Sequence, residues 1–215
     1  MRLALWTLAL MALAGTPLRA QQMTLGAGYA LADYREQAGF LHFTGGGPSA
    51  MVAVERGRLA LRVDAWHLDL DPEKNAAPAL EPFTLDQLNI RLGLRAVSVV
   101  RIEAGYMKRW VDPSRAAQSF SAASLGVRAT YPLAPGAEVA VRTAYVAGTD
   151  FSGGGSAPFG VELGLSAAYG PGSGRFRLTG DYEFQRIDRR TDQGGSRLSV
   201  PIQSSLARVG LTVRF

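Results

Sequence analysis

The chain has 215 residues, of which 47% are hydrophobic, with 25 glycines and no cysteine. Its 23 basic and 18 acidic side chains give a formal net charge of +5 without any basic run, so the composition does not favour a nucleic-acid partner. The lack of cysteine excludes disulfide bonds and a lipid anchor attached through an acylated cysteine.

Residues 1–20 have the pattern of a secretory signal peptide. Arg2 supplies a positive charge, an apolar run covers residues 3–15, and Pro17 precedes a small residue at Ala20. The run is shorter than the roughly 20 residues that a membrane-spanning helix needs. We therefore expect cleavage after Ala20 and export through the inner membrane, with cleavage near residues 12–14 or an uncleaved anchor as alternatives.

From residue 24 onward, hydrophobic and polar residues alternate with a period of two, which is typical of β-strands. The segment QLNIRLGLR (87–95) is the clearest, because its leucine and isoleucine residues all oppose polar residues or glycine. The pattern predicts an all-β domain over residues 21–215, with ten strands or, if the short segment 49–55 is not a strand, eight. The predicted strands are 24–32, 49–55, 59–66, 87–95, 100–107, 123–131, 139–147, 159–169, 175–185 and 207–215.

Long and short connections alternate along the chain. The short ones, rich in glycine and proline, are 56–58, 97–98, 132–137 and 170–174; the long ones are 33–48, 67–84, 108–120, 148–158 and 186–201. This order predicts an up-and-down antiparallel meander with all its long loops at one end. Short periplasmic turns and long extracellular loops are typical of outer-membrane β-barrels.

Two kinds of barrel fit this alternation, a soluble one with its apolar face inward and a membrane one with its apolar face outward. The polar faces favour the membrane barrel, because they carry many glycines, which weaken a strand that faces water but make room inside a narrow lumen. Arginine facing lipid costs roughly 2–4 kcal/mol at the middle of the bilayer, so the polar faces must point inward. Aromatic residues near both strand ends, expected as interfacial girdles, are Tyr131, Tyr169, Phe176 and Phe215 at the short-turn end and Trp66, Trp110, Phe120, Phe159 and Phe184 at the other.

The inward faces predict a lumen lined by charged side chains, which are Arg62, Asp64, Arg91, Arg95, Arg101, Glu103, Arg128, Arg142, Glu162, Arg177, Asp181, Glu183 and Arg208, with Arg214 at the short-turn end. Arg91 should lie across from Glu103 or one diagonal step away. Ion pairs of this kind predict a closed lumen. The alternative is a narrow, weakly anion-selective passage for small solutes.

The chain resembles small outer-membrane β-barrels of Gram-negative bacteria, of the OmpA/OmpX-like or OmpW-like type. The resemblance covers the whole predicted mature chain, although those barrels usually have eight strands. Its most specific motif is the C-terminal ARVGLTVRF, in which Arg208, Gly210, Val213 and Phe215 match the signal read by the barrel-assembly machinery. Many members carry an aromatic residue where this chain has Val213. The resemblance implies a monomer in outer-membrane lipid that is inserted by this machinery.

The segment WHLDLD sets His67, Asp69 and Asp71 on one side of an extended strand at the outer rim. A histidine beside a carboxylate could act as a base or help hold a metal ion. No nucleophile motif accompanies His67, and His42 falls in a glycine-rich segment expected to be a loop. We therefore expect no enzyme, cofactor or metal site. The sequence predicts a structural or surface-interaction protein of the envelope, with a porin-like channel second and a barrel hydrolase third.

Overall fold

The computed structural model describes residues 21–37, 40–73, 80–113, 115–171, 174–193 and 196–215. The predicted signal peptide lies outside these residues. The described chain consists of long strands and one short 3-10 helix, η2 (Ala116–Gln118). The strands are β1 (Gln21–Glu36), β2 (Leu41–Arg56), β3 (Leu59–Pro72), β4 (Phe83–Arg95), β5 (Val100–Asp112), β6 (Phe120–Ala134), β7 (Ala137–Phe151), β8 (Ser156–Tyr169), β9 (Phe176–Gln193) and β10 (Ser196–Arg214). Within the described residues, none of the helical structure is long and apolar enough to cross a membrane.

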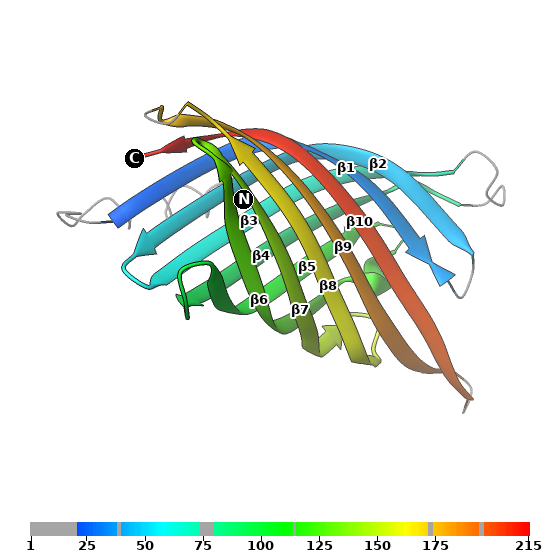
Figure 1. Cartoon of the computed structure of the whole chain (residues 1–215). Coiled ribbons are helices and arrows are strands. Elements are labelled where there is room, and N and C mark those ends of the chain that lie inside the picture. The colour runs from blue at the N-terminus through cyan, green and yellow to red at the C-terminus, as the bar shows by residue number, and fades with distance from the viewer. Residues whose placement is uncertain (1–20, 38–39, 74–79, 114, 172–173, 194–195) are drawn as a thin grey trace, which may run out of the picture.

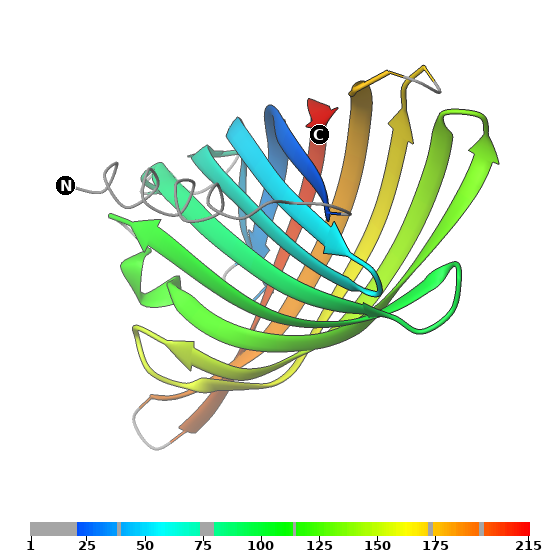
Figure 2. The same ribbon diagram turned by 90° about the vertical axis from the view of Figure 1, so that its left-hand side faces the viewer.

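The ten strands form one closed antiparallel barrel in which each strand pairs with its neighbours along the chain (Figure 1). β10 closes the barrel by pairing with β1, in a register that runs from Thr24 opposite Arg214 to Glu36 opposite Ile202. Figure 2 shows this seam, with β10 in red beside β1 in dark blue. The predicted up-and-down barrel of ten strands is confirmed, and the eight-stranded alternative is wrong.

At the end opposite the short turns, the strands run further than the sequence pattern predicts. Residues 33–48 and 186–201, expected as loops, lie mostly in β1, β2, β9 and β10. The glycines at residues 45–47 mark close packing rather than a loop, because a Cβ atom on Gly45 or Gly47 would collide with the backbone of β3. The longest connections, 73–82 and 113–119, are nevertheless at this end, although the connection between β9 and β10 there is as short as the two-residue turns 57–58 and 135–136 at the other end.

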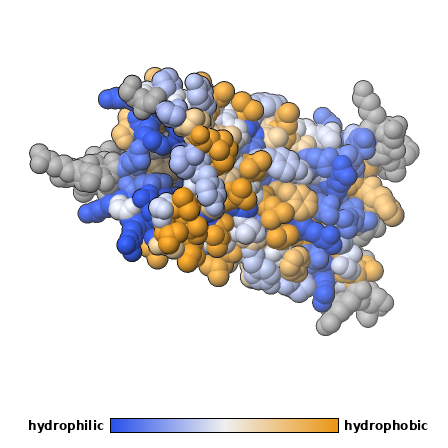
Figure 3. All heavy atoms as spheres, in the orientation of Figure 1, coloured by the Kyte–Doolittle hydropathy of each residue, from blue (hydrophilic) through white to orange (hydrophobic). Residues whose placement is uncertain are grey.

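The outward face of the barrel is apolar in the half nearest the short turns, called here the turn half. Exposed residues from every part of the barrel form this band, among them Leu31, Leu61, Leu92, Ile102, Leu125, Val141, Leu163, Leu178 and Leu211. Hydrophobic residues gather over the middle of the molecule, with hydrophilic residues towards both ends (Figure 3). An apolar band that encircles a protein is far larger than the patches water tolerates, so the turn half spans a membrane.

Aromatic residues border this band, with two exceptions to the prediction. Trp110 and Phe159 are exposed on the outward face, as are the aromatic residues near the short turns, which are Tyr131, Tyr169, Phe176 and Phe215. The expected places of Trp66 and Phe120 in the girdle are wrong, because both side chains point inward and are only 6% and 0% exposed. The error arises because, near these residues, the inward face of the strands changes from polar to apolar and the outward face from apolar to polar.

Strand β3 shows this reversal clearly. In its first part Leu61 faces outward and Asp64 is buried in the lumen. Beyond this point Leu68 and Leu70 are buried inside, whereas Asp69 faces outward with its side chain 72% exposed. The part of the barrel beyond the reversal, called here the loop half, is therefore polar outside and apolar inside, as in a water-soluble barrel.

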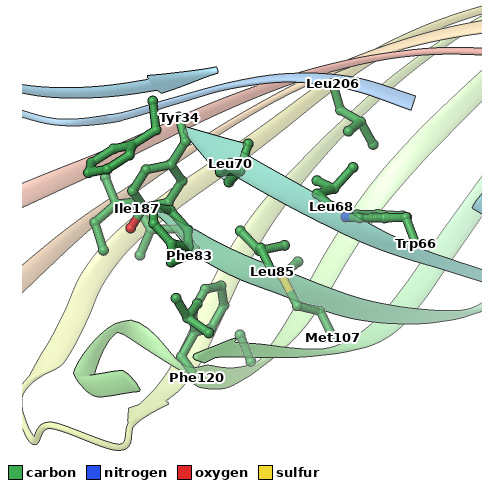
Figure 4. Close-up of a cluster of buried hydrophobic side chains, with 14 of the residues drawn as sticks. Tyr34, Trp66, Leu68, Leu70, Phe83, Leu85, Met107, Phe120, Ile187 and Leu206 are labelled. Atoms are coloured by element: carbon green, nitrogen blue, oxygen red, sulfur yellow. The ribbon is translucent and has the colours of Figure 1, made fainter. Parts of the chain in front are cut away.

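The inside of the loop half is a packed hydrophobic core (Figure 4). Tyr34, Phe43 and Phe83 meet edge to face, with ring centroids 4.8–6.3 Å apart. Further buried members come from all seven other strands and include Trp66, Leu68, Leu70, Met107, Phe120, Val146, Ala157, Ile187, Ile202 and Leu206. Since interiors of this kind pack as densely as organic crystals, the core closes the lumen at this level.

Candidate functional site: the barrel lumen

All thirteen charged residues predicted to line the lumen lie on its inner face. Ten of them border a single cavity in the turn half: Arg62, Asp64, Arg91, Arg95, Arg101, Glu103, Arg128, Arg177, Asp181 and Arg208. The other three, Arg142, Glu162 and Glu183, are buried beside it. The structure thus brings the predicted residues together in two places, a layer of ion pairs across the middle of the barrel and a cavity below it.

The layer of ion pairs has two clusters, each organised by a carboxylate or guanidinium with several partners. Asp64 is fully buried and accepts hydrogen bonds from Arg62 at 2.8 Å, Arg91 at 3.2 Å and Arg208 at 3.4 Å. Arg142 donates to Glu103 at 2.8 Å and to Glu162 at 2.5 Å. Because each buried charge has an opposite partner and further hydrogen bonds, the layer avoids the cost of an unpaired buried ion.

Arg91 and Glu103 lie one diagonal step apart, as expected, because Arg91 is opposite Gly105 in the register of β4 and β5. They are not each other's ion-pair partners, however. Arg91 binds Asp64 and Glu183, the latter at 3.1 Å, and both carboxylates come from strands other than β5. The closed curvature of the wall brings β9 across to β4, which the pairing of neighbouring strands alone does not reveal.

Sequence reasoning missed a polar group at the top of this layer. Arg109 is 3% exposed and donates to the side-chain oxygens of Gln87 and Gln185, each at 2.7 Å. Its guanidinium also lies 5.0 Å from the ring of Phe120, at the floor of the hydrophobic core. Arg109 fell in a segment expected to be a loop, but it continues the inward alternation of β5, and that alternation could have revealed it.

Arginines also border the hydrophobic core on its other side. Arg115 lies 4.9 Å above the ring of Phe43 and binds Glu36 at 3.0 Å. Arg189 lies 4.7 Å from the ring of Phe151 and donates to the backbone oxygen of Gly154 at 2.7 Å. The core therefore lies between two levels of arginine side chains, and each level uses the aromatic rings as apolar support.

The cavity in the turn half has a volume of about 540 Å³. It extends from the ion pairs around Asp64 to the turn residues Ser98 and Val99 and to Arg214 on the last strand, so its mouth is at the short-turn end. On the other side of the ion-pair layer, the second cavity found within the described residues measures only about 20 Å³. The cavity in the turn half, called here the vestibule, is open at the short turns, and the lumen is blocked towards the long connections.

The two histidines lie on the outward surface of the loop half, away from the lumen. His67 and Asp69 are on one side of β3, as predicted, with 3.6 Å between ring nitrogen and carboxylate; a closer partner, Asp86 of β4 at 2.7 Å, was missed. It lies directly opposite His67 in the register. His67 remains 47% exposed. No group of three or more metal-ligating side chains in the described part of the chain is arranged to hold a metal ion.

His42 lies in β2 rather than in the expected loop. Its two ring nitrogens are 2.7 Å from Asp33 and 2.6 Å from Glu73. Burial by itself would lower the pKa of His42, but the hydrogen bonds to the two carboxylates outweigh burial and raise it. Burial likewise opposes the charge on Asp33, and hydrogen bonds from Arg35 and His42 outweigh it, so the pKa of Asp33 is lowered.

The residues of the C-terminal motif form one side of the barrel seam. Gly210 lies directly opposite Gly28 of β1, and a Cβ atom on Gly210 would approach the Gly28 Cα atom to 3.1 Å. Phe215 is 61% exposed on the outside, and its backbone N–H donates to Met23 at 2.8 Å. Arg208, the first residue of the motif, points inward to Asp64. The motif thus combines a close strand contact with an exposed terminal ring.

No family model and no curated protein matches the chain. Among solved structures, the chain is similar to the outer membrane protease OmpT from Escherichia coli, with 9% identity, a TM-score of 0.49, and coverage of 91% of this chain and 96% of that one. It is also similar to Neisserial surface protein A, with 15% identity, a TM-score of 0.44, and coverage of 90% and 97%. The Yersinia pestis protein Ail follows with 10% identity, a TM-score of 0.39, and coverage of 92% and 100%.

These likenesses are too distant to carry a function, so the class of the protein rests on its own geometry. The chain is a ten-stranded transmembrane β-barrel: closed, apolar outside across its turn half and charged inside. Its particular features are a blind, arginine-rich vestibule and a loop half with a hydrophobic core of its own.

Proposed function

We propose that the protein is an outer-membrane barrel with a closed lumen that serves as a structural or surface-interaction protein of the cell envelope. The apolar band, the closed barrel and the secretory pattern of residues 1–20 support this location. In the orientation usual for such barrels, the short turns face the periplasm and the loop half projects outward from the cell. The outward surface of the loop half, which carries His42, His67 and several carboxylates, is then the part available to external partners.

The observation that carries the closed-lumen proposal is the hydrophobic core of the loop half. Tyr34, Phe43 and Phe120 are no more than 1% exposed, although they all point into the lumen. An ion that crossed the barrel would have to pass this core without its hydration shell, at the high cost of burying an isolated charge. The alternative, a porin-like channel, requires the core to open.

Planar-bilayer recording separates these two functions. We expect the purified barrel to show no stable single-channel steps. A Trp66→Phe preparation, in which Trp110 is the sole tryptophan after residue 20, should show emission characteristic of a lipid interface, as proof of insertion. The variants Arg91→Ala and Glu103→Ala, which disturb the ion-pair layer below the core, should stay silent as well. Stable steps in the native protein, altered by either variant, would show that the lumen conducts.

We assign no catalytic role and no cofactor to the protein. The arrangement of His67 between Asp69 and Asp86 is the basis of the third alternative, a barrel hydrolase, but the side chain lies on the outward surface and is half exposed. Incubation with peptides and with lipid A should leave both intact. Cleavage of either that is lost in His67→Ala would establish the hydrolase instead.

We also propose that the barrel is a monomer in outer-membrane lipid and that Arg208, Gly210, Val213 and Phe215 are read by the barrel-assembly machinery. The exposed ring of Phe215 at the end of the seam supports this assignment. Deletion of Phe215 should lower the amount of folded barrel in outer-membrane fractions far more than it lowers the stability of refolded protein. The matched control is Phe176→Ala, which removes an equally exposed ring near the same interface and should assemble normally.

A further inference from the structure

The vestibule carries more positive than negative charge. Eight arginines and five carboxylates line it. Of groups outside the lining, Arg142 binds Glu103, and Glu183 binds Arg91 and Arg208, so the two additions offset each other. The cavity therefore has a surplus of guanidinium groups within low-dielectric walls, where fields from charges are focused.

Several of these arginines are placed directly opposite one another on neighbouring strands. Arg95 faces Arg101, Arg101 faces Arg128, and Arg128 faces Arg142, so that one row of arginines crosses four strands, β4 to β7. Like charges at directly opposed positions are destabilising. A barrel that keeps four arginines in one such row gains stability from any anion that lies between them.

Carboxylates of the chain neutralise three of the four arginines of this row. Glu55 binds Arg101 at 2.9 Å and Arg95 at 3.3 Å, and Arg142 binds two glutamates. Arg128, between them, donates to Ser166 at 3.0 Å, and no carboxylate of the described residues lies within salt-bridge distance of it. The middle of the row is therefore a guanidinium without a counter-charge of its own.

Four buried arginine nitrogens of the described residues lack a hydrogen-bond partner; two line the vestibule, and the other two belong to Arg115 and Arg189 at the hydrophobic core. The Nε atoms of Arg101 and Arg208 are buried and have no hydrogen-bond partner among the described residues, and Arg208 as a whole is only 7% exposed. Unsatisfied buried donors are rare in proteins and call for an explanation such as a bound ion. Both side chains line the vestibule together with Arg128.

We propose that the vestibule binds a small multivalent oxyanion of the phosphate type, held by Arg128 together with other arginines of the lining. Guanidinium groups bind phosphate oxygens through paired hydrogen bonds, and a cavity of about 540 Å³ lies within the usual range for small-molecule sites. The mouth is at the short-turn end, so the ligand enters from the periplasm. This direction rests on the proposed orientation of the barrel, whereas the binding itself does not.

Equilibrium dialysis of the refolded mature barrel in a non-ionic detergent, with labelled pyrophosphate at constant ionic strength, tests the proposal. We expect saturable binding of about one pyrophosphate per barrel, weakened about tenfold or more in Arg128→Gln. The matched control is Arg58→Gln, which removes the same charge from an exposed position in the turn after β2, outside the lining of the cavity, and should bind as the native protein does. Circular dichroism should show that both variants keep the β-barrel.

Tryptophan fluorescence can place the bound anion within the lumen. The ring of Trp66 lies 5.2 Å from the Arg208 guanidinium, and Trp110→Phe leaves Trp66 as the sole tryptophan of the chain after residue 20. Pyrophosphate should change the emission of Trp66 at the concentrations at which it binds, whereas equal ionic strength of chloride should not. Absence of saturable binding, or equal binding by native protein and Arg128→Gln, would overturn the proposal.

Together with the bilayer recordings, the binding measurement tests the anion site and the closed lumen independently. Saturable binding by a silent barrel is the result expected if both proposals hold. Binding by a barrel that conducts, with pyrophosphate reducing the current, would keep the anion site and overturn the closed lumen. A silent barrel that does not bind pyrophosphate would overturn the anion site alone.

Discussion

The turn half and the loop half are built from the same ten strands but reverse the positions of polar and apolar side chains. In the turn half, leucine and valine face outward and arginine faces the vestibule, as with Leu92 and Arg91 on β4. In the loop half, Phe83 and Leu85 of the same strand are buried inside, and Asp86 faces outward. Alternation with a period of two therefore identifies a strand. The medium outside that part of the barrel, lipid or water, determines which face of the strand is apolar.

Because of this reversal, different interactions stabilise the two halves. The loop half faces water outside, so burial of its aromatic core stabilises it through the hydrophobic effect. The turn half faces lipid outside, and its lumen is held by ion pairs around Asp64 and Arg142. Substitutions inside the two halves should therefore differ in kind as well as in size.

The largest effect is expected in the hydrophobic core. Phe43→Ala should lower the free energy of unfolding by about 3–5 kcal/mol, because the buried ring packs against Tyr34 and Phe83 and leaves a cavity. The outward Phe159→Ala, which removes a ring that is 45% exposed, is the control and should cost clearly less. Urea unfolding in detergent measures both, and equal losses would mean that the loop half has no core of the kind described.

The ion-pair layer should show the next largest effect. Asp64→Asn should cost about 2–3 kcal/mol, because it removes the carboxylate shared by Arg62, Arg91 and Arg208 while keeping its shape. Asp188→Asn, on the outward partner of Arg186, is the matched control and should change stability by less than about 1 kcal/mol. If the two variants unfold at the same urea concentration, the layer does not hold the lumen together.

A smaller effect is expected at the seam between β1 and β10. Gly210→Ala should cost about 1–2 kcal/mol, since its new Cβ atom would lie 2.5 Å from the Ala27 oxygen and force the strands apart. Gly164→Ala, another inward glycine, brings its Cβ atom no closer than 3.4 Å to a neighbour and should be nearly neutral. The difference in unfolding between the two refolded variants is the measurement, and a neutral Gly210→Ala would contradict the close contact.

The smallest effect concerns pH and the outward surface of the loop half. Because the pKa of His42 is raised in the folded state, its contribution is complete below the ordinary value of 6.5 and is lost as pH rises through the folded pKa. Asp33, with a lowered pKa, contributes above its ordinary value of 3.8 and loses its contribution as pH falls further. Native protein should thus exceed His42→Gln in stability at pH 5.5 by at most about 1 kcal/mol, and by less at pH 8.5. A difference that grows towards pH 8.5 would have the wrong sign.

The sequence predicts the turn half well and the loop half poorly, for a physical reason. In the turn half, apolar residues opposite arginine leave one stable arrangement in a membrane, and Arg62, Arg128 and Arg208 line the vestibule. In the loop half, the period of two continues, but the apolar residues lie on the inward face. The sequence therefore predicts wrongly that Trp66 and Phe120 face lipid. The partners of Arg91 and Arg109 were also beyond prediction, because curvature of the closed wall brings distant strands together.

The difference between the two halves of the lumen can be tested directly with single cysteines, since the chain has none of its own. Ala53 lines the vestibule, and Ala122 lies in the hydrophobic core with 2% exposure. In native barrels, a water-soluble maleimide should label Ala53→Cys readily and Ala122→Cys only after unfolding. Rapid labelling of both positions would show a continuous water path and contradict the closed lumen.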